Sequence, residues 1–364
     1  MKAMSLGTPR PLDFVRDQRI ERVTSLATPE AMLENQQLGT PAAEVVLRGR
    51  AATTEILDRV DDRLLVVVGP CSVHDVDAAL DYARRLSAQA AELADDLLVV
   101  MRVYFEKPRT TTGWKGLIND PHLDGSGDVN EGLRLARKLL LDVLSLGVPV
   151  GCEFLDPITP QYIADTVSWG AIGARTTESQ VHRQLASGLS MPIGFKNGTN
   201  GNVAMAVDAV RAAAVPHTFP GIDVDGRSAV LVTRGNPDCH IILRGGRRAP
   251  NYSAELIEGA LERLRVVGLP ERVVIDASHD NSGKDPERQP IVVEDIAAQV
   301  AAGSRAIVGV MLESFLIAGR QELGSEELTY GQSITDACMS WETTVEVLDR
   351  LAAAVRDRRQ AQSA

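Results

Sequence analysis

The feature that most constrains the fold of this chain is a repeated alternation between short apolar runs and longer amphipathic segments. From residue 64 onward, eight apolar runs of strand length alternate with segments whose apolar residues recur at helical spacing. Nearly continuous apolar runs are typical of strands that are buried on both faces, as in parallel sheets. Eight strand–helix repeats therefore predict an α/β fold, a closed (β/α)8 TIM barrel.

The predicted strands cover residues 64–69, 97–105, 148–155, 171–175, 192–198, 239–246, 272–279 and 306–314. The predicted helices cover residues 76–93, 131–146, 160–169, 180–189, 203–215, 254–267, 292–302 and 336–358. An open, doubly wound sheet is the alternative architecture. It is disfavoured because the first strand is not followed by the Gly-x-Gly-x-x-Gly pattern that binds dinucleotides in such sheets.

Two segments fall outside this repeat. Residues 1–60 form an N-terminal arm with one predicted helix over residues 41–60. Residues 217–234 alternate like two strands around Asp225-Gly226, which predicts an inserted β-hairpin. We therefore divide the chain into an arm (1–60) and a barrel (61–364) that carries the hairpin 217–234.

Composition and charge exclude several classes of protein. Hydrophobic residues make up 44% and charged residues 24% of the 364 residues, which is typical of a soluble globular protein. The net charge of −11 disfavours general attraction to nucleic acid or to anionic membranes. The chain has no apolar run of membrane-spanning length, and its first residues lack the apolar core of a secretion signal. The four cysteines form no Cys-x-x-Cys pair, so we expect reduced thiols in a cytoplasmic protein. From the net charge we expect no nucleic-acid and no membrane partner.

A cluster of cations follows the second predicted strand, in the stretch MRVYFEKPRTTTGWKG at residues 101–116. It contains Arg102, Lys107, Arg109 and Lys115, and Pro108 restricts the backbone between two of them. Arginine is a bidentate partner for phosphate or carboxylate, and lysine provides a point charge. The stretch is a candidate receptor for an anion, although a solvated basic turn would explain it equally well if it stood alone.

Similar chemistry follows the other predicted strands. Functional groups of a parallel barrel gather at the carboxyl ends of its strands, which form one rim. The residues at these strand ends are Cys71, Arg102 with Lys107, Glu153, Arg175, Lys196, Arg244, His279 and Glu313. Each has an ordinary structural explanation by itself, since cysteine, for example, is often a small buried side chain. Together they indicate an anionic ligand, because unpaired like charges in one cleft repel each other.

A subset of these residues offers metal ligands. Cys71, His279 and Glu313 provide sulfur, nitrogen and oxygen donors, and Asp336, at the predicted start of the last helix, is a fourth candidate. A mixed set of this kind suits a divalent transition metal such as Mn, Fe, Co or Zn, and differs from a closed structural zinc site. A core position for His279 and a solvated position for Glu313 are the alternatives. The cations suffice for two anionic substrates: Arg102, Lys107, Arg109, Arg175, Lys196 and Arg244.

Six stretches of the chain also carry a family resemblance: GPCSVHD (69–75), MRVYFEKPRTTTGWKGLINDP (101–121), GARTTESQVHR (173–183), GFKNGTNG (194–201), HIILRGG (240–246) and YGQSITDAC (330–338). Together they resemble the class I 3-deoxy-D-arabino-heptulosonate 7-phosphate (DAHP) synthases of the bacterial and yeast type, which aromatic amino acids regulate. The resemblance covers nearly the whole chain from about residue 17 onward. It implies a metal-dependent barrel that condenses phosphoenolpyruvate with erythrose 4-phosphate, the first step of the shikimate pathway.

The resemblance also implies roles for individual residues. The implied metal ligands are Cys71, His279, Glu313 and Asp336. The implied phosphoenolpyruvate site consists of Arg102, Lys107, Gly173, Ala174, Arg175, Lys196 and Arg244. The implied erythrose 4-phosphate site consists of Lys107, Pro108, Arg109 and Thr110. Lys107 is then a candidate general acid, and Glu153 is a candidate for orienting the water that reacts.

Regulation is the last implication of the resemblance. In this family the arm and the hairpin build a pocket for an aromatic amino acid at a subunit contact, so a homodimer or homotetramer is expected. The matching residues are Asp17, Pro160, Gln161, Ser190, Phe219 and Gly221. Tyrosine-sensitive members resemble each other in having Gly at the position of Gly221, and phenylalanine-sensitive members have Ser there. The sequence therefore favours tyrosine as the inhibitor.

Two alternative functions remain. The first is 3-deoxy-D-manno-octulosonate 8-phosphate synthase, a barrel enzyme that uses arabinose 5-phosphate. The motif KPRTTTGWKG and the chain length argue against it. The second is a catalytically silent protein that binds aromatic amino acids and regulates a partner. The intact residues Cys71, Lys107, His279, Glu313 and Asp336 argue against this alternative.

Overall fold

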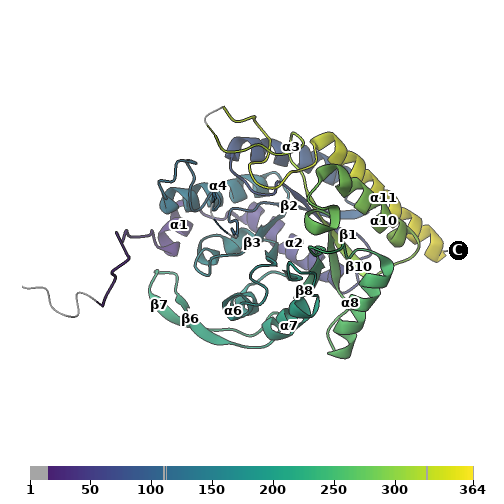
Figure 1. Cartoon of the computed structure of the whole chain (residues 1–364), viewed down its shortest axis with the longest axis horizontal. Helices are drawn as coiled ribbons and strands as arrows, with labels where there is room; N and C mark the ends of the chain where they lie inside the picture. Colours follow the sequence, from purple (N-terminus) through teal and green to yellow (C-terminus); the bar gives the residue numbers. More distant parts are fainter. Residues whose placement is uncertain (1–14, 110, 112, 325–326, 364) are drawn as a thin grey trace, which may run out of the picture.

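Eight parallel strands form a closed barrel with helices packed around its outside (Figure 1). The structure is a computed structural model that describes residues 15–109, 111, 113–324 and 327–363. Within these residues the strands are hydrogen-bonded in the order β1-β10-β9-β8-β5-β4-β3-β2. The predicted (β/α)8 barrel is therefore confirmed, and the hairpin appears as a separate antiparallel pair.

The barrel strands are β1 (Leu64–Gly69), β2 (Leu97–Arg102), β3 (Val150–Glu153), β4 (Trp169–Ile172), β5 (Ile193–Lys196), β8 (His240–Leu243), β9 (Val273–Asp276) and β10 (Ile307–Glu313). The hairpin strands are β6 (Thr218–Ile222) and β7 (Ser228–Val232). In the ladder between them Gly221 is opposite Ala229.

The helices are α1 (Pro29–Asn35), α2 (Thr40–Leu57), α3 (Val76–Glu92), α4 (Val129–Ser145), α5 (Pro160–Ile163), α6 (Gln180–Gly188), α7 (Ala204–Ala213), α8 (Ala254–Val266), α9 (His279–Ser282), α10 (Gln289–Ala301) and α11 (Trp341–Ser363). Two short 3-10 turns are η2 (Ala164–Thr166) and η3 (Pro286–Arg288). Among the described residues, every helix is too short or too polar to cross a lipid bilayer.

Two of the predicted helices have wrong bounds. The segment 160–169 is not one helix, because α5 gives way to η2 and Trp169 already belongs to β4. Trp169 is fully buried and pairs with Gly151 of β3, so burial in the barrel overrides the helical spacing of the sequence. The last helix begins at Trp341 and not at residue 336, because Met339 N donates a hydrogen bond to Glu313 O and extends the end of β10. The helices α1, in the arm, and α9, after β9, were not predicted.

The core has two layers that follow the alternation of side chains along the strands. In β1, Leu65 and Val67 belong to a cluster inside the barrel, whereas Val66 and Val68 belong to the larger cluster outside it. All four side chains are fully buried. Full burial of each such side chain contributes about 1.5–3 kcal/mol to the free energy of folding. Because both faces of these strands are buried, their sequences are continuous apolar runs.

The helix α2 belongs with the barrel core. Its last residues Ile56 and Leu57 are 1% exposed and join the inner cluster beside Leu65 and Val67. The helix therefore covers the amino-terminal end of the barrel, opposite the rim that carries the predicted functional residues. The assignment of residues 1–60 to assembly and regulation stays a prediction.

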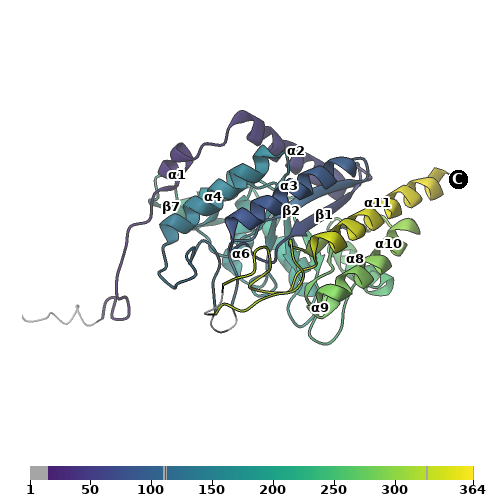
Figure 2. The same ribbon diagram turned by 90° about the horizontal axis from the view of Figure 1, so that it is seen from above.

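The remainder of the arm lies beside the hairpin. Glu30 N donates a hydrogen bond to Val224 O at the hairpin tip, at 2.9 Å. Tyr162 of α5 donates its hydroxyl to Ala27 O at 2.7 Å. Residues 15–26 are exposed, and the first described residues run away from the barrel (Figure 2). The two segments that fall outside the barrel repeat therefore meet on one side of it.

Candidate active site

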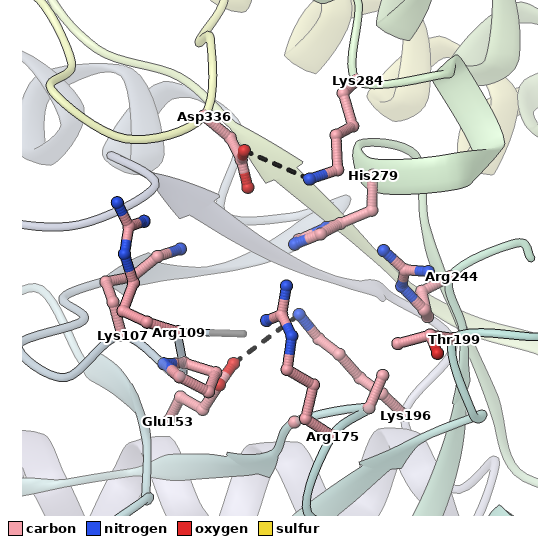
Figure 3. A pocket seen from close by; sticks show the side chains of 13 residues that line it. Lys107, Arg109, Glu153, Arg175, Lys196, Thr199, Arg244, His279, Lys284 and Asp336 are labelled. Carbon is pink, nitrogen blue, oxygen red and sulfur yellow. Dashed lines mark hydrogen bonds and ion pairs between the residues drawn. The ribbon is translucent and has the colours of Figure 1, made fainter. Parts of the chain in front are cut away.

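A small cavity of about 120 Å³ opens at the carboxyl ends of the barrel strands (Figure 3). Charged side chains from several strand ends point toward its centre. Its lining consists of Lys107, Pro108, Arg109, Glu153, Gly173, Ala174, Arg175, Lys196, Thr199, Arg244, His279, Lys284 and Asp336. Most of the residues predicted for the substrate site therefore lie around one cavity. Thr110 lies outside the described residues.

The loop after β2 presents Lys107, Pro108 and Arg109 because it closes on itself at its base. Lys107 N donates a hydrogen bond to Lys115 O at 2.9 Å. Gly116 has a φ of +116°, and a Cβ at this position would lie 1.9 Å from Phe105 O. Only glycine fits there, because a side chain would force the two ends of the loop apart.

Three of the four predicted metal ligands lie together. Single ligand atoms of Cys71, Glu313 and Asp336 all lie within 4.8 Å of one another. Cys71 and Glu313 are buried and are not among the residues that line the cavity, whereas Asp336 lines it. Thiolate and carboxylate donors in this arrangement suit a divalent transition metal. The residues present therefore fit the predicted metal centre.

His279, the fourth predicted ligand, lies beside this group. Its Nε2 is 3.7 Å from Glu313 Oε1, and its Nδ1 is 2.9 Å from Asp276 Oδ2. Its backbone is in the left-handed region, with a φ of +50°. A non-glycine residue in this conformation costs on the order of 1 kcal/mol, so surrounding contacts must hold it there.

The segment that carries Asp336 is fastened to the ends of two strands. Thr335 and Ser72 share a hydroxyl–hydroxyl hydrogen bond of 2.7 Å just beyond β1. Met339 is bonded to Glu313 O at the end of β10, as described above. These contacts explain why a residue from a loop, and not from a helix start, lies close to Glu313 and Cys71.

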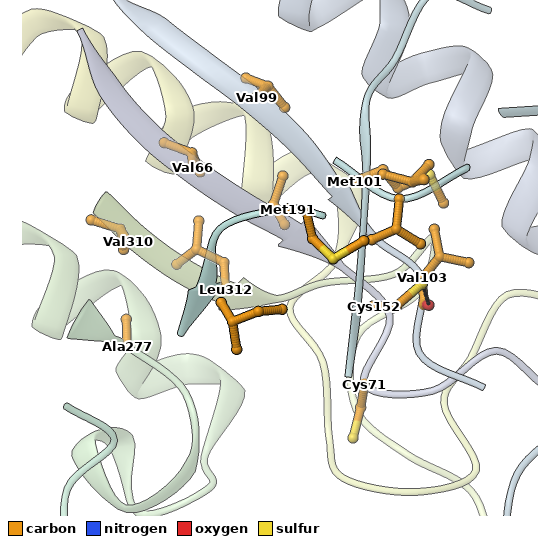
Figure 4. Close-up of a cluster of buried hydrophobic side chains, with 14 of the residues drawn as sticks. Val66, Cys71, Val99, Met101, Val103, Cys152, Met191, Ala277, Val310 and Leu312 are labelled. Atoms are coloured by element: carbon orange, nitrogen blue, oxygen red, sulfur yellow. Dashed lines mark hydrogen bonds between the residues drawn. The ribbon is translucent and has the colours of Figure 1, made fainter. Parts of the chain in front are cut away.

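Cys71 lies at the edge of the outer core cluster, beyond the end of β1 (Figure 4). Its thiol is fully buried, and Lys107 Nζ lies 2.9 Å from its Sγ. Burial, and then the Glu313 carboxylate, raise the pKa of this thiol, and Lys107 acts in the opposite direction. A cation is therefore needed beside Cys71 for the thiolate to form.

The electrostatic environment of the carboxylates follows from the same cations. Burial alone would raise the pKa of Asp336, but Lys107 and His279 hold it below its usual range. Burial would likewise raise the pKa of Glu313, which His279 and Arg102 lower. Both carboxyl groups are therefore ionised at neutral pH, which is the form that binds a metal.

Arg102 does not line the cavity, although the sequence placed it among the substrate residues. It is fully buried, and its Nη2 donates to Glu313 Oε1 at 2.9 Å and to Cys71 O at 3.0 Å. Its guanidinium carbon lies 3.6 Å from the centroid of the Tyr104 ring. These contacts hold two candidate metal ligands in place, and a direct contact with substrate stays a prediction for Arg102.

The remaining cations converge on the opposite wall. Lys196 Nζ lies 3.7 Å from Glu153 Oε2 and 3.4 Å from Asp276 Oδ2. Arg244 forms an ion pair with Asp280. Arg175 follows β4 and also faces the cavity. The wall thus offers several fixed cations to an anionic ligand.

Three residues of this region were not predicted. Thr199 and Lys284 line the cavity, and Lys284 Nζ lies 3.3 Å from Asp336 Oδ1. Asp276 is fully buried and contacts both His279 and Lys196. A signal for Asp276 was present, because it is a single acid at the end of an apolar strand. Thr199 and Lys284 stand in polar loops, where their spacing carries no comparable signal.

A second, larger pocket of about 530 Å³ lies beside the hairpin, away from the barrel mouth. Its lining consists of Leu33, Arg50, Pro160, Gln161, Ala164, Asp165, Leu185, Gly188, Leu189, Ser190, Phe219, Leu231, Val232 and Thr233. Four of the predicted effector residues, Pro160, Gln161, Ser190 and Phe219, are among them. We call this the lateral pocket.

Two predicted effector residues do not line the lateral pocket. Asp17 is exposed in the first described part of the arm. Gly221 lies behind Leu231, and a Cβ at this position would be 2.6 Å from Leu231 Cδ1. A larger residue at position 221 would therefore act on the pocket by displacing Leu231.

Comparison with known proteins identifies the family. The chain matches the DAHP synthetase I family over residues 35–349. It is 57% identical over 344 residues to the Phe-sensitive phospho-2-dehydro-3-deoxyheptonate aldolase of Escherichia coli, covering 94% of this chain and 98% of that protein. It is 56% identical over 353 residues to the phospho-2-dehydro-3-deoxyheptonate aldolase of Corynebacterium glutamicum, covering 95% of this chain and 96% of that protein.

A solved structure gives the same result. The phospho-2-dehydro-3-deoxyheptonate aldolase of Francisella tularensis superposes with a TM-score of 0.92 at 50% sequence identity. The match covers 93% of this chain and 99% of the other chain. The barrel, the ligand set at its mouth and these similarities agree, and this chain belongs to the DAHP synthetase I family.

Proposed function

We infer that this protein is a DAHP synthase, which condenses phosphoenolpyruvate with erythrose 4-phosphate and water to give DAHP and phosphate. This reaction is the first step of the shikimate pathway. The observation that carries the inference is a cavity lined by fixed cations and by Asp336, whose carboxylate lies with Cys71 and Glu313 in one ligand set, in a chain of this family. Two phosphorylated substrates require cations, and an aldehyde acceptor benefits from a Lewis acid.

The cations divide between the two substrates. Arg175, Lys196 and Arg244 lie on one wall and hold the carboxylate and phosphate of phosphoenolpyruvate, together with the backbone around Gly173 and Ala174. Lys107, Pro108 and Arg109, with Thr110 next in the chain, receive the phosphate of erythrose 4-phosphate. Arg102, which donates to Glu313, is the remaining residue that we assign to phosphoenolpyruvate. Charges fixed on both sides bring the two reacting carbons together, which is chiefly a proximity effect.

The residues suited to hold the metal are Cys71, His279, Glu313 and Asp336. When bound there, a divalent cation such as Mn²⁺, Co²⁺, Fe²⁺ or Zn²⁺ would supply Lewis-acid polarisation of the aldehyde. The chain contributes the ionised ligands for it, since neighbouring cations keep Asp336 and Glu313 deprotonated.

Proton transfers fall to Lys107 and Glu153. The alkene carbon of phosphoenolpyruvate forms a bond to the aldehyde carbon as the C=C and C=O π bonds break, which leaves positive charge at C2 and an alkoxide at the former aldehyde oxygen. Lys107 donates a proton to that oxygen. Burial opposes the charge of Lys107, but Cys71 and Glu313 raise its pKa, so it carries a proton to give. Glu153, 3.7 Å from Lys196, orients and deprotonates the water that adds to C2. Loss of phosphate from that carbon then gives the keto product.

The lateral pocket is the proposed inhibitor site. The family contains members named Phe-sensitive and Tyr-sensitive, which are 57% and 54% identical to this chain. The pocket holds an aromatic side chain between Phe219, Leu231 and Leu185. Glycine at position 221 has no side chain that would displace Leu231, which lines the pocket. The pocket therefore keeps room for the hydroxyl group of tyrosine, and we favour tyrosine as the inhibitor. Asp17 would reach the site from a neighbouring chain in a homodimer or homotetramer.

The cellular setting follows from the chemistry. All four cysteines are free and buried, which suits a reducing compartment. The substrates are phosphorylated metabolites, so we place the protein in the cytoplasm.

A direct assay tests this function. The purified chain is incubated with phosphoenolpyruvate, erythrose 4-phosphate and Mn²⁺, and inorganic phosphate and DAHP are both measured. We expect the two products in equal amounts, and no turnover when either substrate is omitted. Arabinose 5-phosphate in place of erythrose 4-phosphate tests the octulosonate alternative. Absence of any turnover, with binding of an aromatic amino acid, would instead support the silent regulatory protein.

A further inference from the structure

The feature that goes beyond this assignment is the buried carboxylate of Asp276, the last residue of β9. We propose that Asp276 is a positioning residue that sets His279 for the metal and Lys196 for the substrate at the same time. The inference rests on the proposed function, because His279 and Lys196 take their roles from it.

The contacts of Asp276 divide between its two oxygen atoms. Oδ1 accepts hydrogen bonds from Ser278 N at 3.0 Å and from Ser278 Oγ at 2.5 Å, which fixes the orientation of the carboxylate. Oδ2 lies 2.9 Å from His279 Nδ1 and 3.4 Å from Lys196 Nζ. The side chain is 0% exposed, so no solvent competes for these contacts. A buried carboxylate is costly unless charged partners surround it, and here both partners belong to the site.

The contact with His279 determines which nitrogen faces the metal. A neutral imidazole carries one proton. The Asp276 carboxylate, whose Oδ2 lies 2.9 Å from Nδ1 but outside hydrogen-bond geometry, attracts that proton to Nδ1 electrostatically, and the hydrogen bond at Nδ1 is made to Ser278 Oγ at 2.9 Å. The lone pair is then on Nε2, which lies 3.7 Å from Glu313 Oε1 on the side of the ligand set. Because Ser278 Oγ donates its own proton to Asp276 Oδ1, it accepts the proton of Nδ1, so Asp276 acts on the His279 ring through this serine as well as through its charge.

The contact with Lys196 determines where its charge lies. The ammonium group lies between Asp276 and Glu153, and its side chain is 3% exposed. The two carboxylates hold it at the wall of the cavity, where it would face a bound anion. One buried residue thus links the metal side of the cavity to the phosphoenolpyruvate side.

The test compares the Asp276→Asn variant with wild type and with Glu106→Gln. The amide keeps the shape of the carboxylate, but in either orientation it turns an N–H toward Ser278 or toward His279 and Lys196. Glu106→Gln is the matched control, because Glu106 is also a buried carboxylate (3% exposed) near the rim. Its partners are backbone N–H groups and Thr159, and none is a candidate metal ligand.

Two quantities are measured on the full-length protein: Mn²⁺ affinity by calorimetry, and the KM for phosphoenolpyruvate at saturating Mn²⁺. We expect Asp276→Asn to weaken Mn²⁺ binding by about 10- to 100-fold and to raise the KM for phosphoenolpyruvate even when metal is saturating. Glu106→Gln should leave Mn²⁺ affinity at the wild-type value. A folded Asp276→Asn variant with wild-type Mn²⁺ affinity would overturn the inference alone. Wild-type protein that binds no Mn²⁺ would overturn the metal assignment and this inference together.

A measurement on wild-type protein keeps the inference testable if the variant does not fold. The ring nitrogens of His279 are observed by ¹⁵N NMR in metal-free protein, with His279→Gln to assign the signals. We expect a proton on Nδ1. A neutral ring with its proton on Nε2 alone would overturn the inference.

Discussion

The cavity at the barrel mouth and the lateral pocket differ in almost every physical respect. The mouth cavity is small, at about 120 Å³, and ten of its lining positions are charged or polar side chains that include Lys107, Arg175 and Asp336. The lateral pocket is several times larger, at about 530 Å³, and is lined mainly by neutral residues such as Leu185, Phe219 and Leu231.

The difference shows how the two regions are supported. The mouth is built on the ends of fully buried strands, and ion pairs such as Lys196 with Asp276 hold its side chains in place. The lateral pocket is built from the arm, the hairpin and short helices, and the hairpin strands are exposed or only half-buried. Changes at the mouth should therefore affect the reaction itself, and changes at the lateral pocket should affect only the response to a ligand.

The largest effect is expected from removal of the metal or of its thiolate ligand. EDTA should abolish turnover, and Mn²⁺ or Co²⁺ should restore it, because the ligand set then holds its Lewis acid again. Cys71→Ala should give a folded protein without turnover at any Mn²⁺ concentration tested. Cys239→Ala is the control, since Cys239 is also buried but lies just before β8, at its amino-terminal end. Full turnover by a metal-free sample would contradict the assignment of a metal centre at the mouth.

The next effect separates the two walls of the mouth. Arg175→Ala and Arg244→Ala should raise mainly the KM for phosphoenolpyruvate, and Arg109→Ala mainly that for erythrose 4-phosphate. Each loses one charge-assisted contact, which costs about 1.5–3 kcal/mol or roughly 10- to 150-fold in affinity. Steady-state kinetics with each substrate varied in turn checks the division. Equal increases of both constants in all three variants would show that the walls are not specialised.

A third effect is expected at Glu106, which lies between the two regions. Glu106 precedes Lys107 and accepts hydrogen bonds from Leu155 N, Asp156 N and Thr159 Oγ1, just before the segment that lines the lateral pocket. Burial, and then Asp156, raise the pKa of Glu106 to about 7.

The unfolded chain therefore loses this proton near pH 4.5 and the folded chain near pH 7. Stability contributed by the bound proton is present below about pH 4.5 and is lost as the pH rises to about 7. We expect Glu106→Gln to remove this dependence, so that its destabilisation relative to wild type shrinks by roughly 2–3 kcal/mol between pH 5 and pH 8. Urea unfolding at both pH values measures it, with Glu44→Gln on the exposed face of α2 as the control. A difference independent of pH would contradict the expectation.

The smallest effect is expected in the lateral pocket. Gly221→Ser should displace Leu231 and shift inhibition from tyrosine toward phenylalanine, by roughly tenfold or less in relative inhibitor affinity. Turnover without inhibitor should not change, because Gly221 is remote from the mouth lining. Inhibition curves with each aromatic amino acid provide the measurement, and Val230→Thr on the exposed face of the hairpin is the control. If none of the three amino acids inhibits the wild-type protein, the proposed role of this pocket as an inhibitor site is wrong.

Much of the mouth could be predicted because chain order and barrel geometry are linked. Every strand of a parallel barrel points the same way, so a charged residue after any apolar run reaches the same rim. This rule alone placed five residues at the rim, and all five line the cavity: Lys107, Glu153, Arg175, Lys196 and Arg244. The rule did not predict which of them form ion pairs, or with which partners. Arg102 shows the limit of the rule, because its side chain is buried against Glu313 and does not line the cavity.

The errors share a physical cause. Trp169 reads as the end of a helix, yet pairing with β3 and burial inside the barrel make it the start of β4. Asp336 reads as the start of a helix, yet the bond from Met339 N to Glu313 O keeps its segment extended. In both places contacts between residues distant in the sequence outweigh local helical preference.

The sequence by itself determined the barrel, the hairpin, the family and most of the groups at the mouth, because apolar periodicity and strand-end chemistry are local properties of the chain. Only the tertiary structure decided how these groups are paired. It placed Asp276 between His279 and Lys196, Arg102 against Glu313, and Leu231 between Gly221 and the lateral pocket. These contacts join residues that are far apart along the chain, and their energies depend on distance and burial, which exist only once the barrel has closed.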